Sequence, residues 1–287
     1  MSERRSFVTV IRWPWGWQQP ERIGALVAAL GLDPYDAEMV ATRQAPLPVG
    51  ILTLEQPRDA AWILREKRVA ALAVSSKEID DLADPTKAKR LVVPAGEPPG
   101  FYMVEPWRGE GRGLSLGRVV LMVRGRTVRS KTTTTVDTSD PYFMLDMVGG
   151  WEGRVARELL DDGTGAAKGL IRESRDAGST EVLDLWLEDG SCVRVDGRKF
   201  NFDVLGKKGH CDAQNSAALG LMLAEQAPTA EVDQGFSDFR PPTAFRVPLV
   251  SRGVVTVSRD DSPMFDFYSR WNFIVPRAVR RAKSAAG

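Results

Sequence analysis

The sequence holds very few of the side chains that ligate metals or carry thiol and imidazole chemistry. Among 287 residues there are two cysteines, Cys192 and Cys211, and one histidine, His210. Two cysteines cannot build a disulfide framework or a cysteine-rich zinc site, and one imidazole is a poor basis for a histidine metal site. We therefore expect no metal, no cofactor and two reduced thiols.

Long apolar runs and an excess of one charge are also missing. Lysine and arginine total 39 and aspartate and glutamate total 38, so the chain as a whole gives no charge argument for nucleic acid or an anionic membrane. No run reaches the ~18 apolar residues of a membrane span, and the N-terminal residues lack the apolar core of a secretory signal. These observations predict a cytoplasmic protein.

No catalytic or nucleotide-binding motif is legible in the chain. A Gly-x-Ser-x-Gly nucleophile elbow, a phosphate-binding loop and a dinucleotide fingerprint after a strand are all absent. His210 and Cys211 are adjacent, so their side chains ordinarily point in different directions and make a poor pair of base and nucleophile. Carboxylate pairs such as Asp80 and Asp81 fall in loop-like stretches, where solvated turn residues are commoner than acid and base pairs. We therefore expect a protein that is not an enzyme.

The chain does contain enough apolar material for folded cores. Hydrophobic residues make up 43% of the sequence and charged residues 27%, a balance typical of globular domains. The length is about twice the commonest size of a single domain, which favours two modules. A stretch rich in aspartate, proline and glycine follows residue 80, and we place the boundary at residue 85.

Residues 1–85 alternate between short β-branched runs and amphipathic segments. Strands are expected over 7–11, 37–44, 49–55 and 70–74, and helices over 20–30 and 57–67. The apolar positions predict a core of Ile23, Leu26, Leu30, Ile51, Leu64 and Val74. This βαββαβ order resembles the ferredoxin-like superfold and its small regulatory domains. The superfold hosts many activities, so the resemblance implies no function.

Residues 86–230 read as strands followed by one helix. Strand-like composition occurs at 101–104, 118–128, 182–187 and 192–195, and a helix follows Asp212 and ends before Pro228. This order is similar to that of a bacterial pleckstrin-homology-like (PH-like) domain, with a long glycine-containing insert at 132–179. The expected fold class is therefore α+β: a ferredoxin-like domain, then a mainly antiparallel β domain closed by a helix, then residues 231–287 as an extended C-terminal arm.

Three indoles in five residues mark the first candidate binding site. Trp13, Trp15 and Trp17 stand around Pro14 and Gly16, where the chain leaves its first strand. A loop does not easily bury three indoles, and exposed tryptophan is enriched in binding hot spots. Contact with a partner protein and docking on this protein's own second module both explain the cluster.

Arginines on one strand form the second candidate. Residues 112–131 contain no acidic residue, and Arg118, Arg124 and Arg126 share one face of a strand because side chains alternate. Such a face has the chemistry to bind phosphate groups. The commoner explanation is a solvated strand face that acidic residues such as Glu181 neutralise from a neighbouring strand.

The C-terminal segment is the third candidate. It places Phe265, Phe267, Trp271 and Phe273 before a basic end, a composition that suits an interfacial helix on a membrane or a packed arm. Because Pro276 interrupts any long helix, we expect an arm that packs on a partner or on the body of the protein.

Two classes of function remain from these three candidates. The first is a scaffold or interaction protein that binds a protein partner or a second copy of itself through the tryptophan loop and the C-terminal arm. The alternative is a peripheral binder of anionic surfaces, lipid headgroups or less favourably nucleic acid, through the arginine strand and basic tail. Binding through phosphates weakens steeply with salt, which separates the two.

Overall fold

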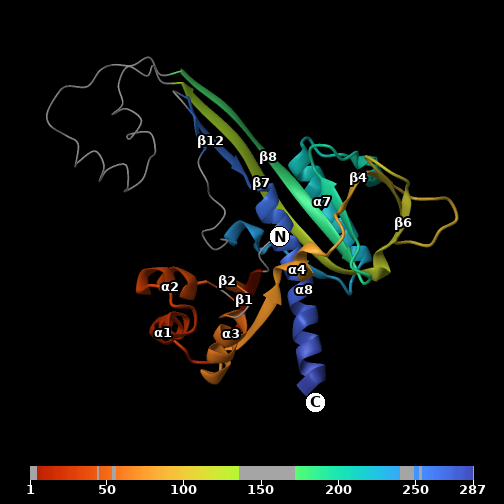
Figure 1. The fold of residues 1–287 in the computed structure, drawn as a ribbon. Coiled ribbons are helices and arrows are strands. Elements are labelled where there is room, and N and C mark those ends of the chain that lie inside the picture. Colours follow the sequence, from red (N-terminus) through yellow and green to blue (C-terminus); the bar gives the residue numbers. More distant parts are fainter. Residues whose placement is uncertain are drawn as a thin grey trace. The chain divides into compact units, whose positions relative to one another are not determined.

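The computed structural model describes residues 5–43, 45–53, 56–135, 172–239, 249–251 and 254–286. These residues form a mixed α and β structure with a three-stranded antiparallel sheet, a larger mixed sheet and a C-terminal helix (Figure 1). The chain divides into two compact units. The first comprises Met1–Arg126, Glu181–Phe245 and Met264–Gly287, and the second comprises Thr127–Thr180 and Arg246–Pro263.

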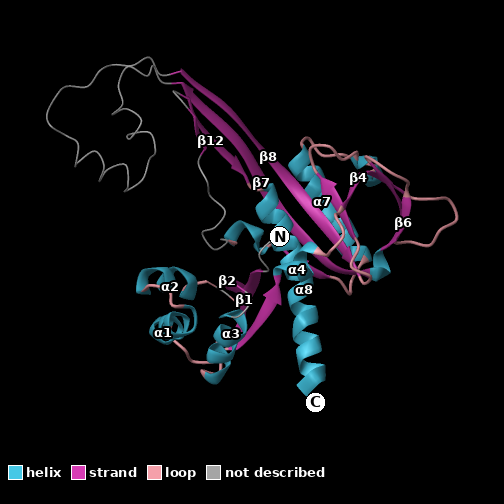
Figure 2. Cartoon of the chain, in the orientation of Figure 1, coloured by secondary structure: helices cyan, strands magenta, loops and turns pink. Residues whose placement is uncertain are grey.

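The first unit begins with a module in which three helices lie beside a three-stranded sheet (Figure 2). Strand β1 is central and pairs antiparallel with both β2 and β3. The elements in chain order are β1 (Arg5–Arg12), α1 (Gln19–Leu30), α2 (Pro34–Ala41), β2 (Leu47–Thr53), α3 (Gln56–Glu66), β3 (Ala70–Ser75) and the short α4 (Ser76–Asp80).

The strand expected over 37–44 is wrong, because these residues belong mainly to helix α2. The side chain of Asp33 accepts hydrogen bonds from the backbone N–H groups of Tyr35 and Asp36, at 2.8 and 3.0 Å, and Pro34 occupies the first helical position. These are strong signals for the start of a helix. The module is therefore β-α-α-β-α-β with three strands, and not the four-stranded βαββαβ unit expected from the sequence.

The predicted core of this module is confirmed in its main members. Leu26 and Leu64 are fully buried, and Ile23 and Leu30 pack against the same cluster between the sheet and helices α1, α2 and α3. Val74 is also fully buried, but on the opposite face of the sheet. The side chain of Ile51 lies outside the described residues. The sheet is thus covered on both faces.

The larger sheet follows α4 in the chain. Its strand order is β11-β12-β7-β8-β9-β4-β5-β6, and β10 pairs with β7. Strand β4 pairs with β9 and β10 with β7 in parallel, whereas β4–β5, β5–β6, β8–β9, β7–β12 and β11–β12 pair antiparallel. The strands are β4 (Thr86–Val92), β5 (Phe101–Pro106), β6 (Arg112–Ser115), β7 (Val119–Thr135), β8 (Arg172–Leu187), β9 (Cys192–Asp196), β10 (Glu231–Asp233), β11 (Leu249–Ser251) and β12 (Val254–Asp260).

Helices and turns complete this part of the chain. The 3₁₀ turns are η1 (Leu116–Arg118), η2 (Phe202–Leu205) and η3 (Gly235–Asp238), and the helices are α7 (Asp212–Gln226) and α8 (Ser262–Ala286). The expected helix after Asp212 is confirmed as α7. A tight turn at Asp189 and Gly190 joins β8 to β9, and Gly190 has a φ of 87°.

Both ends of the expected insert at 132–179 are strand. β7 continues to Thr135 and β8 begins at Arg172, so both strands are longer than the sequence pattern predicted. Residues 136–171, which make up most of the expected insert, lie outside the described part of the chain.

Apolar side chains on the large sheet alternate between two cores in the first unit. Met122 of β7 packs with Leu219 and Leu223 of α7, whereas its neighbours Leu121 and Val123 pack on the other side, in the cluster that contains α8. This alternation is the period-two pattern of a strand that is buried on both faces. The sheet therefore needs a cover on each side, and α8 supplies the second one.

Candidate interaction surface

The C-terminal aromatics are part of the protein's own core. The segment packs on the body of the protein, which is one of the two placements expected for it, but it does so as helix α8 and not as an extended arm. Phe265, Trp271 and Phe273 are almost fully buried and Phe267 packs at the edge of the same cluster. Pro276 lies inside α8 without ending it. A proline removes one backbone donor from a helix, and here the apolar contacts of the helix with the sheet outweigh that loss. These aromatics are not available as a binding surface.

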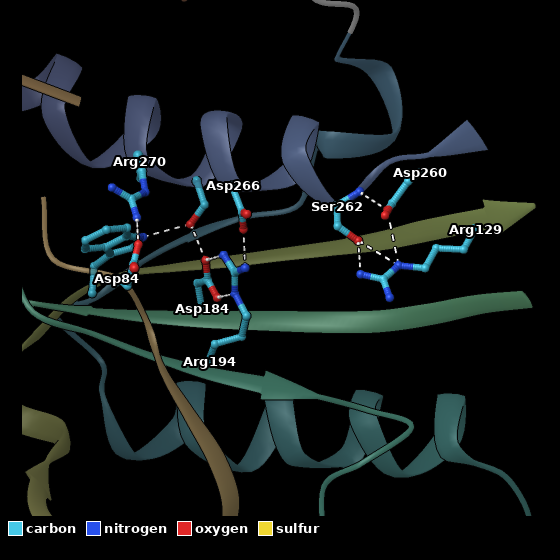
Figure 3. A network of polar contacts seen from close by, with 10 residues as sticks. Asp84, Arg129, Asp184, Arg194, Asp260, Ser262, Asp266 and Arg270 are labelled. Atoms are coloured by element: carbon cyan, nitrogen blue, oxygen red, sulfur yellow. Dashed lines mark hydrogen bonds and ion pairs between the residues drawn. The ribbon is translucent and has the colours of Figure 1, made fainter. Parts of the chain in front are cut away.

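One polar network holds α8 against the sheet (Figure 3). The fully buried carboxylate of Asp184 on β8 accepts two hydrogen bonds of 2.6 Å from Arg194 on β9, which also pairs with Asp266 on α8. The Ser269 hydroxyl donates to Asp184 at 2.6 Å and accepts from the Trp186 indole at 2.8 Å. Burial opposes the charge of Arg194, but the carboxylates of Asp184 and Asp266 more than offset it and raise the pKa of the guanidinium.

Arg270 and Trp271 also connect α8 to earlier parts of the chain. Arg270 donates to the carbonyl of Leu82 at 2.7 Å and to the carboxylate of Asp84 at 2.7 Å, in the segment that leads into β4. The Trp271 indole N–H donates to the Thr9 hydroxyl of β1 at 3.2 Å. Because all these polar groups are satisfied inside the protein, the network serves the fold and leaves no group directed at a ligand.

The three arginines of the second candidate do not lie together on one strand. Arg118 belongs to the η1 turn and pairs with Asp189 at 2.9 Å. Arg124 lies on β7 against Gly220 of α7, and Arg126 is 3.9 Å from the carboxylate of Glu181. The strand begins one residue after Arg118, so the expected alternation applies only to the other two. Acidic neighbours meet Arg118 and Arg126, as the solvated-face explanation requires.

The cysteines and the histidine lie apart from any cluster of ligands. Cys192 is buried between the sheet and α8, and burial raises the pKa of its thiol well above the usual range. Cys211 and His210 are exposed just before α7. In the described part of the chain no three histidine, cysteine or acidic side chains stand close enough to hold a metal ion, and no helix is long and apolar enough to span a bilayer.

The tryptophan loop presents one of its three indoles to solvent. Trp13 is buried in the core of the N-terminal module, and Trp17 is half-buried and stacks on it with ring centroids 6.5 Å apart. Trp15 is fully exposed. Docking of the loop on the second module is therefore wrong for Trp13 and Trp17, which pack into their own module because that module has room for two indoles beside α1.

Trp15 stands at the tip of a well-braced turn. The Trp17 N–H donates to the Pro14 carbonyl at 3.3 Å, and Gly16 between them has a φ of 83°, a left-handed conformation that suits glycine. Beneath the turn, Arg22 of α1 donates to the carbonyls of Trp17 and Ala41, at 3.3 and 3.4 Å. Through Arg22 these hydrogen bonds connect the loop to the first part of α1 and to the C-terminal end of α2. The turn leaves the side chain of Trp15 in solvent.

The topology brings three parts of the chain to the same end of the module. Because β1 and β3 are antiparallel and Arg12 pairs with Ala70, the loop after β1 lies beside the turn that joins α3 to β3. The Arg22 hydrogen bond to Ala41 adds the C-terminal end of α2. We call this region the tryptophan end: the loop 13–18, the turn 67–69 and the C-terminal halves of α2 and α3.

The tryptophan end carries further exposed apolar and basic side chains. Trp62 of α3 is 57% exposed and Met39 of α2 is 50% exposed. Arg12, Lys67 and Arg68 are exposed cations beside them. Sequence reasoning missed all five. A signal was present for Trp62, which lies off the apolar stripe of an amphipathic helix, but no local pattern shows which loop the turn 67–69 meets.

Comparison with protein-family models, with curated proteins and with solved structures finds no match to this chain.

Proposed function

We propose that this protein is a non-enzymatic interaction protein and that it binds a protein partner through the tryptophan end. The observation that carries the proposal is the full exposure of Trp15 on a braced turn, with Trp62 and Met39 exposed at the same end. Covering one large apolar side chain contributes ~1.5–3 kcal/mol, and tryptophan is the residue most enriched among energetic anchors of interfaces. A rigid turn also lowers the entropy that binding costs.

The alternative function, binding of an anionic surface through the arginine strand and the basic tail, has less support. Arg118 and Arg126 have acidic neighbours, and in the basic tail Arg281 pairs with Glu78 at 3.0 Å and Arg277 donates to the Glu188 carbonyl at 2.7 Å. For the fold, we retain as a proposal the likeness of residues 86–230 to a PH-like domain. Its support is the order of strands β4 to β9 followed by α7.

The proposed function is tested by comparing three forms of the full chain in affinity capture from the source cell, with quantification of each co-purified protein. The forms are wild type, Trp15→Ala and Trp107→Ala. Trp107 is a matched control because it is 49% exposed on the other side of the module boundary, after β5. We expect at least one partner to fall about tenfold or more with Trp15→Ala and to persist with Trp107→Ala.

Two further measurements complete that test. All three forms should melt nearly alike, because Trp15 is fully exposed and Trp107 is about half exposed. The mass of wild type in solution shows whether the partner is a second copy of the chain. Equal recovery of every partner by wild type and Trp15→Ala, together with an unchanged mass, contradicts the proposal.

A further inference from the structure

The charge around Trp15 indicates what kind of partner segment this surface fits. Building on the function proposed above, we infer that the tryptophan end binds an acidic segment of its partner, with carboxylates on the cations and one apolar side chain beside Trp15. The inference rests on two observations: three exposed cations without ion pairs, and an arginine in a backbone conformation that favours glycine.

Three exposed cations surround the loop. Arg12 ends β1, and Lys67 and Arg68 form the turn next to the register partner of Arg12. None of the three makes an ion pair or a side-chain hydrogen bond with a residue that the structure describes. Uncompensated charge of one sign favours an oppositely charged ligand, both in steering its approach and in selecting it.

Acidic residues at this end offset part of that charge. The carboxylate of Glu21 accepts from the Gln18 N–H at 3.0 Å, as part of the cap that starts α1. Glu38 of α2 accepts from the amide of Gln19 on α1 at 3.1 Å. Both donors are neutral, so the two carboxylates keep their negative charge, and Glu66 adds a third. Five cations stand against these three acids at this end, so a small positive excess remains among the described residues: Arg12, Arg22, Arg65, Lys67 and Arg68.

The backbone at Arg68 adds a second observation. The Val69 N–H donates to the Leu64 carbonyl and the Arg68 N–H to the Arg65 carbonyl, which is the hydrogen-bond pattern of a Schellman helix end. Arg68 occupies its left-handed position with a φ of 64°, and it is the one non-glycine residue with positive φ among those described. Glycine fits there without strain. Strain of this kind is often retained where the side chain has a function, and binding an anion is the function available to an exposed guanidinium.

An acidic protein segment fits these features better than nucleic acid or an anionic bilayer. The whole chain has a formal net charge of +1, so it gives little long-range attraction to a polyanion. Three unpaired cations and one fully exposed indole at the same end of the module, which also exposes Trp62 and Met39, match a few carboxylates and one apolar anchor. This is the scale of a short peptide.

The test is a display selection of random twelve-residue peptides on the immobilised full chain, followed by fluorescence anisotropy of the enriched peptides. We expect peptides with net negative charge and one aromatic or large aliphatic residue. Their affinity should fall about tenfold or more for Trp15→Ala and about tenfold for the pair Lys67→Gln and Arg68→Gln. The matched control pair Arg198→Gln and Lys207→Gln removes two exposed cations elsewhere and should leave affinity unchanged.

Other outcomes overturn the inference in different ways. If the enriched peptides are neutral or basic and their binding depends on Trp15, the interaction function is supported and the inference of an acidic partner segment is wrong. No enrichment, or enrichment insensitive to both Trp15→Ala and the Lys67 and Arg68 pair, removes this surface as the site. The chain could instead bind oligodeoxythymidine, or vesicles containing phosphatidylserine, more tightly than the peptides and in a Trp15-dependent way. That outcome identifies the partner as a nucleic acid or a membrane and contradicts a protein segment.

Discussion

At the scale of single residues, the tryptophan loop shows how three identical side chains take three roles. Trp13 fills the module core, Trp17 covers Trp13, and Trp15 meets only solvent. The difference arises from the turn, in which Gly16 permits the reversal that points Trp15 away from α1. Composition alone identifies such a cluster, whereas the backbone decides which member is available for binding.

The strained backbone at Arg68 gives a prediction about stability. Replacing Arg68 by glycine should raise the free energy of unfolding by about 1 kcal/mol, because glycine adopts the left-handed conformation without a steric penalty. The urea midpoint of the full chain measures this. Lys67→Gly, one residue earlier, is the control and should lower stability. Lys67 does not have positive φ, so glycine there relieves no strain and only raises the conformational entropy of the unfolded chain. A lower midpoint for Arg68→Gly contradicts the strain.

At the scale of elements, helix α8 depends on the buried charges beneath it. Asp184→Ala leaves the Arg194 guanidinium in a largely buried place with only Asp266 to pair with, and it removes the acceptor of Ser269. Breaking one side of a buried ion pair costs about 3–5 kcal/mol. We expect a loss of that size in thermal or urea unfolding.

The matched control for that change is Asp189→Ala. Asp189 pairs with Arg118, but both side chains are about half exposed, 49% and 53%. Exposed pairs contribute about 0–1 kcal/mol because water competes for them. Similar losses for Asp184→Ala and Asp189→Ala contradict the role given to the buried network.

Local patterns in the sequence predicted most elements but not their partners. The strand at 70–74 and the helices at 20–30 and 57–67 were foreseen because each carries a complete local period of apolar residues. Helix α2 was missed because residues 37–44 were interpreted as a strand, although Asp33 and Pro34 just before them are signals for the start of a helix. The role of α8 was missed because the surface that it covers includes Trp186, far away in the sequence, and no local pattern reports an uncovered sheet face.

The same limit applies to the candidate site. Trp15 was foreseen from composition, but Arg12, Lys67 and Arg68 join it only through the pairing of β1 with β3. The register that brings Arg12 opposite Ala70 depends on the fold of the whole module. Conversely, Phe265 and Trp271 were assigned to an interface because their apolar character was visible and their cover was not.

At the scale of the whole molecule, the N-terminal module and the large sheet share α8. Phe7, Leu72 and Val74 belong to the same buried cluster as Trp271 and Ile274. Removing residues 262–287 should therefore expose apolar surface on both the module and the sheet. We expect the truncated chain to lose cooperative melting and to bind a hydrophobic dye such as ANS.

A shorter truncation controls for chain length. A chain that ends after Val279 retains the buried part of α8, and the lost residues whose exposure is described, 280–284, are all exposed, so it should melt like wild type. An arm that docks only on a partner gives the opposite result, with unchanged melting for the removal of 262–287. That outcome contradicts the shared core.

The hydrogen bond between Trp271 and Thr9 also sets an order of events during synthesis. The two residues are 262 positions apart in the chain. At ~5–20 residues per second, a ribosome needs on the order of tens of seconds to add Trp271 after Thr9. During that interval the sheet face that contains Phe7 and Val74 has no cover. Nascent chains of this protein should therefore be clients of ribosome-associated chaperones until α8 emerges, and prematurely terminated chains should be preferred substrates for proteolysis.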